Sequence, residues 1–167
     1  ALPICETVAT FVSLGGTVID TAPDYGRAEE VLGRILAETK LRDRVFLCSK
    51  VGTPGREAGA AEIARSFQRM KTSVIDLIAV HNLIDPDANL ATLRDLKAQE
   101  KIRYLGATVW RDSQLADLEA LMTRETLDFI QVNYALDSRL AAERVLPLAA
   151  EQGYAPDSLA CTGDTAE

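Results

Sequence analysis

The sequence predicts a parallel α/β fold in which strands and helices alternate along the chain. About five apolar runs are each followed by an amphipathic stretch, which favours parallel strands joined by right-handed crossovers. The run at 45–50 is apolar almost throughout, so both of its faces should be buried, as in a sheet covered by helices. Polar residues that close successive strands are separated by roughly 23 to 31 residues, which fits one strand–helix unit each.

The number of units sets a limit on the architecture. A closed barrel of eight such units needs roughly 250 residues, whereas this chain has 167. Either the sheet is open or part of a barrel is absent. We expect one domain over residues 1–155. The stretch 156–167 has no hydrophobic periodicity and is expected to be a disordered tail.

Each element has its own signal in the sequence. The first helix has apolar residues at helical spacing and is stopped by Gly15. Ser113 is expected to be the N-cap of the helix that follows it. Pro147 should kink the last helix or start a second one. The expected strands cover residues 17–20, 45–50, 74–80, 102–108 and 127–132. The expected helices cover residues 4–14, 28–40, 60–71, 90–100, 113–123 and 139–152.

Composition excludes several classes of protein. The net charge is -7 and the pI is about 4.8, which argues against a nucleic-acid partner. The apolar runs are too short to span a bilayer, so no membrane association is expected. Cys5, Cys48 and Cys161 have no metal-ligand spacing, and a sparse, odd set of cysteines suits a reducing compartment. We therefore expect a cytoplasmic protein without a metal site.

Four polar side chains mark the ends of successive strands or the loops after them. Asp20, Lys50 and His81 each close a strand, and Tyr25 lies in the loop after the first strand. Parallel strands bring their carboxyl ends to one rim, so we expect these four side chains to meet. Singly, each has an ordinary structural explanation, such as a solvated strand end for Lys50 or a core position for His81. Together, in this order, they indicate a site.

The chemistry of such a cluster is proton donation to an oxygen. A free tyrosine has a pKa of about 10 and is a poor acid at neutral pH. A lysine ammonium beside a tyrosine stabilises the phenolate, and an aspartate paired with that lysine offsets the cost of burying it. A histidine nearby can hydrogen-bond the substrate oxygen or share the proton. The cluster could therefore protonate a carbonyl oxygen that becomes an alkoxide when hydride arrives.

The motifs VIDTAPDYG, FLCSK, DLIAVHN, IRYLGATVW and LDFIQVNY together resemble the aldo-keto reductase family. The resemblance implies a (β/α)8 TIM barrel, incomplete here, that reduces a small carbonyl substrate with NADPH and has no Rossmann motif. Consistently, the sequence contains no GxGxxG. On the family pattern Tyr25 is the general acid, Lys50 and Asp20 tune it, and His81 orients the carbonyl.

The resemblance also implies residues that hold the cofactor. Thr108 takes the place of a serine that contacts the nicotinamide carboxamide, Gln131 matches a glutamine in that role, and Asn82 is a third candidate for NADPH/NADP⁺ binding. Val109 departs from an asparagine that many members have. The first barrel strand would precede Ala1, and the last two strands, with the cofactor-anchoring loop, would follow the sequence. The chain alone is therefore expected to be inactive.

Two other hypotheses stay open. The chain could be a non-catalytic regulatory or interaction member of the same family, or an open five-stranded α/β protein with its own function. The complete set of four rim residues favours the enzyme. An open sheet would leave unpaired edges near Val18 and near Ile130, where the chain could self-associate.

Overall fold

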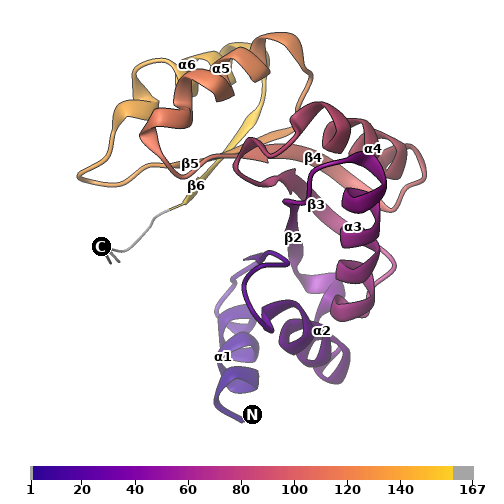
Figure 1. Cartoon of the computed structure of the whole chain (residues 1–167). Coiled ribbons are helices and arrows are strands. Elements are labelled where there is room, and N and C mark those ends of the chain that lie inside the picture. Colours follow the sequence, from indigo (N-terminus) through magenta and orange to yellow (C-terminus); the bar gives the residue numbers. More distant parts are fainter. Residues whose placement is uncertain (1, 160–167) are drawn as a thin grey trace.

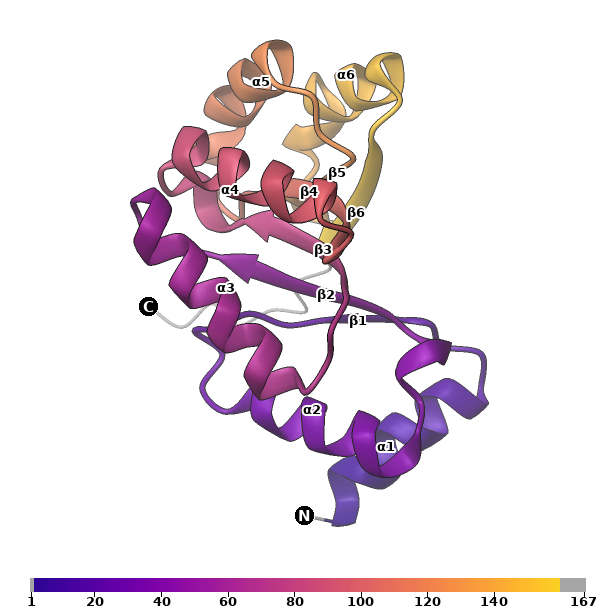
Figure 2. The same cartoon turned by 90° about the vertical axis from the view of Figure 1, so that its right-hand side faces the viewer.

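A computed structural model describes residues 2–159 of the chain and shows a curved, parallel sheet with helices along its outer side (Figure 1). The six strands follow one another in sequence order, and every neighbouring pair is parallel. The turned view shows the strands stacked one above the next, each connected by a helix (Figure 2). The predicted parallel architecture of an incomplete barrel is thus confirmed.

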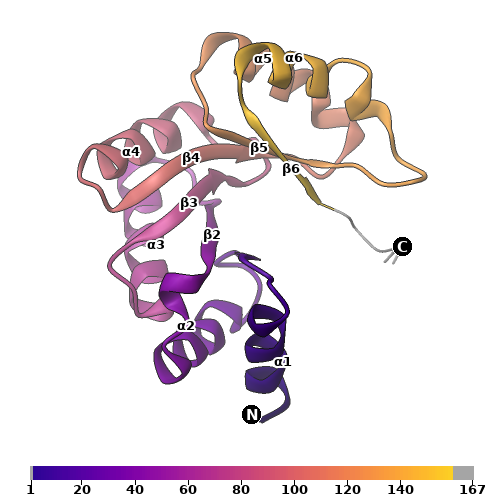
Figure 3. The ribbon, with the colours of Figure 1, turned by 180° about the vertical axis from the view of Figure 1, so that it is seen from behind.

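Strands and helices alternate as the apolar pattern predicts. The strands are β1 (Val18–Asp20), β2 (Phe46–Val51), β3 (Ile75–Val80), β4 (Ile102–Thr108), β5 (Phe129–Asn133) and β6 (Ala155–Leu159). The helices are α1 (Leu2–Ser13), α2 (Ala28–Thr39), α3 (Arg56–Met70), α4 (Pro86–Ala98), α5 (Leu115–Arg124) and α6 (Val145–Gln152). Seen from behind, α1 and α2 lie at one end of the arc, and α5 and α6 lie at the other (Figure 3).

The core lies between the sheet and its helices. Side chains alternate across each strand, so Leu47, Ile78 and Ile130 point the opposite way from Lys50 and are fully buried. The face that carries Lys50 holds an aromatic cluster of Phe46, Tyr104 and Phe129, whose ring centroids lie 5.3–5.7 Å apart. Tyr104 is 39% exposed there, because helices cover only one side of the curved sheet.

Several helix boundaries differ from those that the sequence predicts. Helix α3 begins at Arg56 and α4 at Pro86, each four residues earlier than expected. Gly55 has φ 87°, a backbone conformation that glycine adopts easily, and it ends the loop before α3. Proline is well tolerated in a first helical turn, so α4 can begin at Pro86. Ser113 is not an N-cap, because it lies within a 3₁₀ turn (Asp112–Gln114) before α5. Pro147 lies in the first turn of α6 and so begins a second helix rather than kinking one.

The expected disordered tail does not begin at residue 156. Residues 155–159 form β6, whose Ala155 pairs with Phe129 and whose Leu159 pairs with Asn133 of β5. This pairing uses the backbone, and an edge strand tolerates the proline in it, so no apolar alternation is required. The two outer strands are therefore β1 and β6, and the edge expected near Ile130 is wrong. The rest of the expected tail, residues 160–167, lies outside the described residues.

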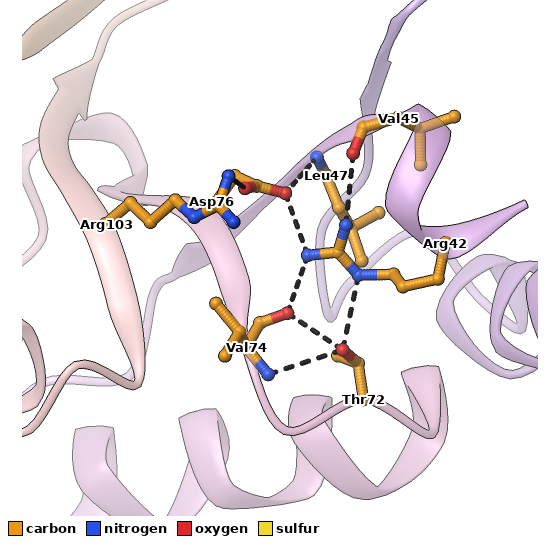
Figure 4. Close-up of polar contacts among 7 residues, drawn as sticks. All are labelled: Arg42, Val45, Leu47, Thr72, Val74, Asp76 and Arg103. Atoms are coloured by element: carbon orange, nitrogen blue, oxygen red, sulfur yellow. Dashed lines mark hydrogen bonds and ion pairs between the residues drawn. The ribbon is translucent and has the colours of Figure 1, made fainter.

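A buried carboxylate, Asp76, ties together the beginnings of three strands (Figure 4). It accepts a 2.9 Å hydrogen bond from the Leu47 amide of β2 and pairs with Arg42 at 2.8 Å and with Arg103 of β4 at 3.0 Å. The Asp76 side chain is only 2% exposed, so these donors offset its desolvation. The other donors of Arg42 bond to Thr72 Oγ1 and to the carbonyls of Val45 and Val74.

We predict that Asp76→Ala lowers the free energy of unfolding by about 3 kcal/mol, because it leaves buried donors and a guanidinium without their acceptor. Urea denaturation measures the change. The matched control is Asp87→Ala, which removes an exposed pair with Arg124 and should cost no more than about 1 kcal/mol. Equal losses in the two variants would show that Asp76 does not hold the strands.

Candidate active site

The topology brings four polar residues to one rim of the sheet. Asp20 is the last residue of β1, Lys50 lies near the end of β2, and His81 directly follows β3. These strands are parallel neighbours, so their ends are adjacent. Tyr25 lies in the loop that connects β1 to α2. The rim is the carboxyl end of the strands, where βα folds carry their chemistry.

Lys50 is the central residue of the rim. Its side chain is 1% exposed, and its ammonium donates hydrogen bonds to Asp20 Oδ2 at 2.6 Å and to the Thr21 carbonyl at 3.0 Å. A buried ammonium is costly unless such acceptors surround it. The carboxylate and the carbonyl therefore fix the position of Nζ at the end of β2.

Tyr25 lies over this ammonium. Lys50 Nζ is 5.1 Å from the centroid of the Tyr25 ring, within the range of a cation–π contact. Nζ contacts the ring of Tyr25. Among the described residues, no hydrogen bond joins this Nζ to the phenol oxygen of Tyr25. The tyrosine is 46% exposed, and its backbone is held by hydrogen bonds to Ala22 and from Ala28. A buried cation thus lies beneath a phenol that solvent can reach.

His81 completes the group. Its ring packs edge-on against Tyr25, with centroids 6.2 Å apart and planes at 80°. Its side chain is 12% exposed, and Nδ1 lies 3.5 Å from Asp24 Oδ2. Burial lowers the pKa of His81 below its ordinary 6.5, and the Lys50 ammonium lowers it further, while Asp24 opposes the shift. The imidazole is therefore neutral at pH 7.

The three residues that the resemblance associates with the cofactor are also neighbours. Thr108 of β4 is directly opposite Gln131 of β5, and both are buried. The Asn82 amide donates to Thr108 Oγ1 at 3.3 Å, and Asn82 has a left-handed backbone, φ 53°. Gln114 supports this loop by donating to the Asn82 carbonyl at 3.2 Å. These contacts place Thr108 and Gln131 next to Asn82, the residue that follows His81.

Two carboxylates of the site were not identified from the sequence. Asp24 faces His81, and Glu62 of α3 accepts hydrogen bonds from the amides of Gly52 and Thr53 and from the Thr53 hydroxyl. Glu62 thereby holds the loop after β2 close to His81. Asp24 lies within the VIDTAPDYG motif, but the motif does not show which way its side chain points, and Glu62 lies in none of the quoted motifs.

Within residues 4–155, whose side chains the structure describes, no three His, Cys, Asp or Glu side chains are grouped so that they could hold a metal ion. No helix of this described part is long and apolar enough to cross a membrane.

Comparison with known proteins agrees with the fold and the motifs. The model of the Aldo/keto reductase family matches residues 4–156. Aldo-keto reductase YhdN of Bacillus subtilis is 32% identical over 159 residues, which cover 86% of this chain and 47% of that protein. Methylglyoxal reductase YeaE of Escherichia coli is 33% identical over 84% of this chain and 51% of its own length. The chain belongs to the aldo/keto reductase family, a family of oxidoreductases.

A solved structure gives the same result in three dimensions. The aldo-keto reductase of Klebsiella pneumoniae in complex with NADPH superposes with a TM-score of 0.81 at 28% identity. The match covers 93% of this chain and 56% of that one. The chain thus spans about half the length of the curated relatives and of this structure, consistent with its six strands of an incomplete barrel.

The lowered pKa of His81 predicts a pH dependence of stability. Well above pH 6.5 the histidine is neutral in both the folded and the unfolded chain and contributes nothing to the slope. As the pH falls below 6.5 the unfolded chain binds the proton first, so the free energy of unfolding decreases until the lower, folded pKa is reached. Urea denaturation at a series of pH values descending from 6.5 should show this loss in the wild type, and His81→Gln should remove it. Identical slopes for the two proteins would contradict the assignment.

Proposed function

We propose that the barrel to which this chain contributes reduces an aldehyde or ketone to an alcohol with NADPH, and that Tyr25 is its proton donor. The observation that carries this proposal is the buried Lys50 ammonium, held by Asp20 and the Thr21 carbonyl, beneath the exposed Tyr25 ring. A buried ammonium contributes little to the stability of the fold at a rim that is open to solvent. It has a chemical use next to a phenol that must give up a proton.

Each residue then has a defined part. The Tyr25 hydroxyl donates its proton to the carbonyl oxygen, which gains negative charge as the carbonyl carbon is reduced. The ammonium of Lys50 stabilises the phenolate that remains, because the two charges are opposite and Nζ lies 5.1 Å from the ring centroid. Asp20 keeps the ammonium in place at 2.6 Å. NADPH supplies the hydride when bound.

The residues fit a nicotinamide on the same rim. Its carboxamide needs one or more hydrogen-bonding partners, and the hydroxyl of Thr108, the amide of Gln131 and the side chain of Asn82 lie on adjacent elements beside His81. Val109 is buried in the core at 1% exposure, so it adds no polar group there. The NADPH complex of the Klebsiella pneumoniae relative supports the choice of cofactor. Methylglyoxal, the substrate in the name of the Escherichia coli relative, is the natural first probe.

We predict that Tyr25→Phe and Lys50→Met each reduce turnover by about 10²–10⁴-fold, the usual contribution of a general acid. The assay uses a completed barrel, in which residues 2–159 are joined to the strands of the Bacillus subtilis relative that lie outside the match. Loss of NADPH absorbance with methylglyoxal is measured. Lys101→Met, at an exposed lysine away from the rim, is the matched control and should leave turnover unchanged. Full activity of Lys50→Met would refute the proposal.

We also predict that the 167-residue chain alone binds NADPH weakly and reduces no aldehyde at a useful rate. A ligand on the concave face of the described sheet has protein on one side only, so the hydride donor is not held against a carbonyl. The single tryptophan, Trp110, lies two residues beyond β4 and is 50% exposed, so its fluorescence should report binding. We expect little quenching for the chain and clear quenching for the completed barrel. Tight binding by the chain alone would show that these strands suffice.

A further inference from the structure

We propose that Glu29 is a positioning residue that holds Tyr25 over Lys50 from the other side of β2. Glu29 lies in the first turn of α2, the helix that the Tyr25 loop enters, and it is only 2% exposed. Its Oε1 accepts a 2.8 Å hydrogen bond from the Ser49 hydroxyl, and its Oε2 accepts a 3.0 Å hydrogen bond from Arg69 of α3. The consequence for catalysis rests on the proposed function, but the placement of the Tyr25 ring does not.

Two consecutive residues of β2 take part in this arrangement, one on each face of the sheet. Lys50 points away from the helices, and its ammonium lies 5.1 Å from the centroid of the Tyr25 ring. Ser49 is buried and points toward the helices, where it meets Glu29, because side chains alternate along a strand. The tyrosine ring and the start of α2 therefore both contact the same short segment of one strand, from opposite faces.

The loop between β1 and α2 transmits the position of the helix to the ring. The Thr21 amide donates to the Cys48 carbonyl at 3.1 Å, which attaches the start of the loop to β2. The Ala28 amide, at the first residue of α2, donates to the Tyr25 carbonyl at 3.0 Å, which attaches Tyr25 to the helix. A displacement of the amino end of α2 therefore moves Tyr25 relative to Lys50.

The amino-terminal half of α2 also lies close against α3. A Cβ on Gly33 would lie 2.3 Å from the carbonyl oxygen of Arg69, so this approach of the two helices requires glycine. Glu29 lies about one helical turn before Gly33, and its carboxylate pairs with the side chain of the same Arg69. The hydrogen bond to Ser49 then joins the two packed helices to the sheet.

A carboxylate is rarely found fully buried between a helix and a sheet. Burying the charge is costly, and an apolar residue of similar volume often stabilises a fold as well or better. A carboxylate with two donors fixes a direction and a register, whereas apolar packing tolerates small displacements. The negative charge of Glu29 also interacts favourably with the positive end of the α2 dipole. The buried pair therefore serves the exact placement of α2, and with it the placement of Tyr25.

NMR of the 167-residue chain tests the placement of the ring directly. In the wild type, nuclear Overhauser effects should connect the ring protons of Tyr25 with side-chain protons of Lys50 and His81, whose contacts with that ring define the site. Glu29→Ala should abolish these effects, because the start of α2 is no longer attached to β2. Glu29→Gln should retain them, because its amide oxygen can still accept the Ser49 hydroxyl.

Two controls separate positioning from a loss of charge or of stability. Glu30→Ala removes a half-exposed carboxylate from the same helical turn and should leave the Tyr25 contacts unchanged. Asp128→Ala removes a carboxylate that accepts the Leu105 amide and pairs with Lys97 directly before β5. It should lower the stability to urea without moving Tyr25. Circular dichroism establishes that each variant is folded.

Ser49→Ala is a milder variant, because it removes the hydroxyl and leaves the pair of Glu29 with Arg69 in place. It should weaken the Tyr25 contacts, and it decides the question where Glu29→Ala does not fold. Unchanged contacts in Ser49→Ala or in folded Glu29→Ala would overturn the proposal. So would an equal loss of these contacts in Asp128→Ala, because that loss would follow from lower stability alone.

The completed barrel tests the link to catalysis. Glu29→Ala should lower kcat for methylglyoxal by about 10²-fold with little change in KM, as expected when reacting groups are misplaced by about 1 Å. In a Tyr25→Phe background the same substitution should cause no further loss, because Glu29 acts through Tyr25. A further loss of equal size would overturn this role of Glu29. The NMR contacts require neither NADPH nor turnover, so a failure of the proposed function is seen separately.

Discussion

The burial of one ammonium group is the constraint on which the site depends. Lys50 is 1% exposed at the end of β2, and an unpaired charge there would cost several kcal/mol. Its acceptors must therefore come from the neighbouring strand and the turn after it: β1 ends at Asp20, and the next residue turns its carbonyl toward Nζ. The loop that leaves this turn carries both Asp24 and Tyr25. The position of the proposed proton donor thus follows from the need to satisfy a buried lysine.

At the other end of the same sheet the buried charge that joins the strands is negative. Asp76 is a buried carboxylate surrounded by guanidinium groups and a backbone amide, and it joins the beginnings of β2, β3 and β4. Strands clamped at the start have little freedom to change register at the end, so Asp76 supports the rim from a distance. This division agrees with the general pattern of βα barrels, in which the carboxyl ends carry chemistry and the amino ends carry stability.

The parts of the structure that sequence reasoning found are those that residue type and spacing encode. Asp20, Lys50 and His81 stand out because each closes an apolar run, and topology then brings strand ends together. The role of the Thr21 carbonyl had no signal, because a backbone acceptor is independent of residue type. Strand β6 was missed because its pairing with β5 uses the backbone alone. Asp24 was missed because the direction of a loop carboxylate depends on the folded path of the loop.

We infer that Asp20 and Lys50 act as one unit at the end of the first two strands. A double-mutant cycle of Asp20→Asn and Lys50→Met, followed by urea denaturation at pH 7, measures their coupling directly. We expect the single variants to be strongly non-additive, with a coupling free energy of at least about 1 kcal/mol, because each removes the partner that makes the other tolerable. Additive losses, with a coupling near zero, would contradict it.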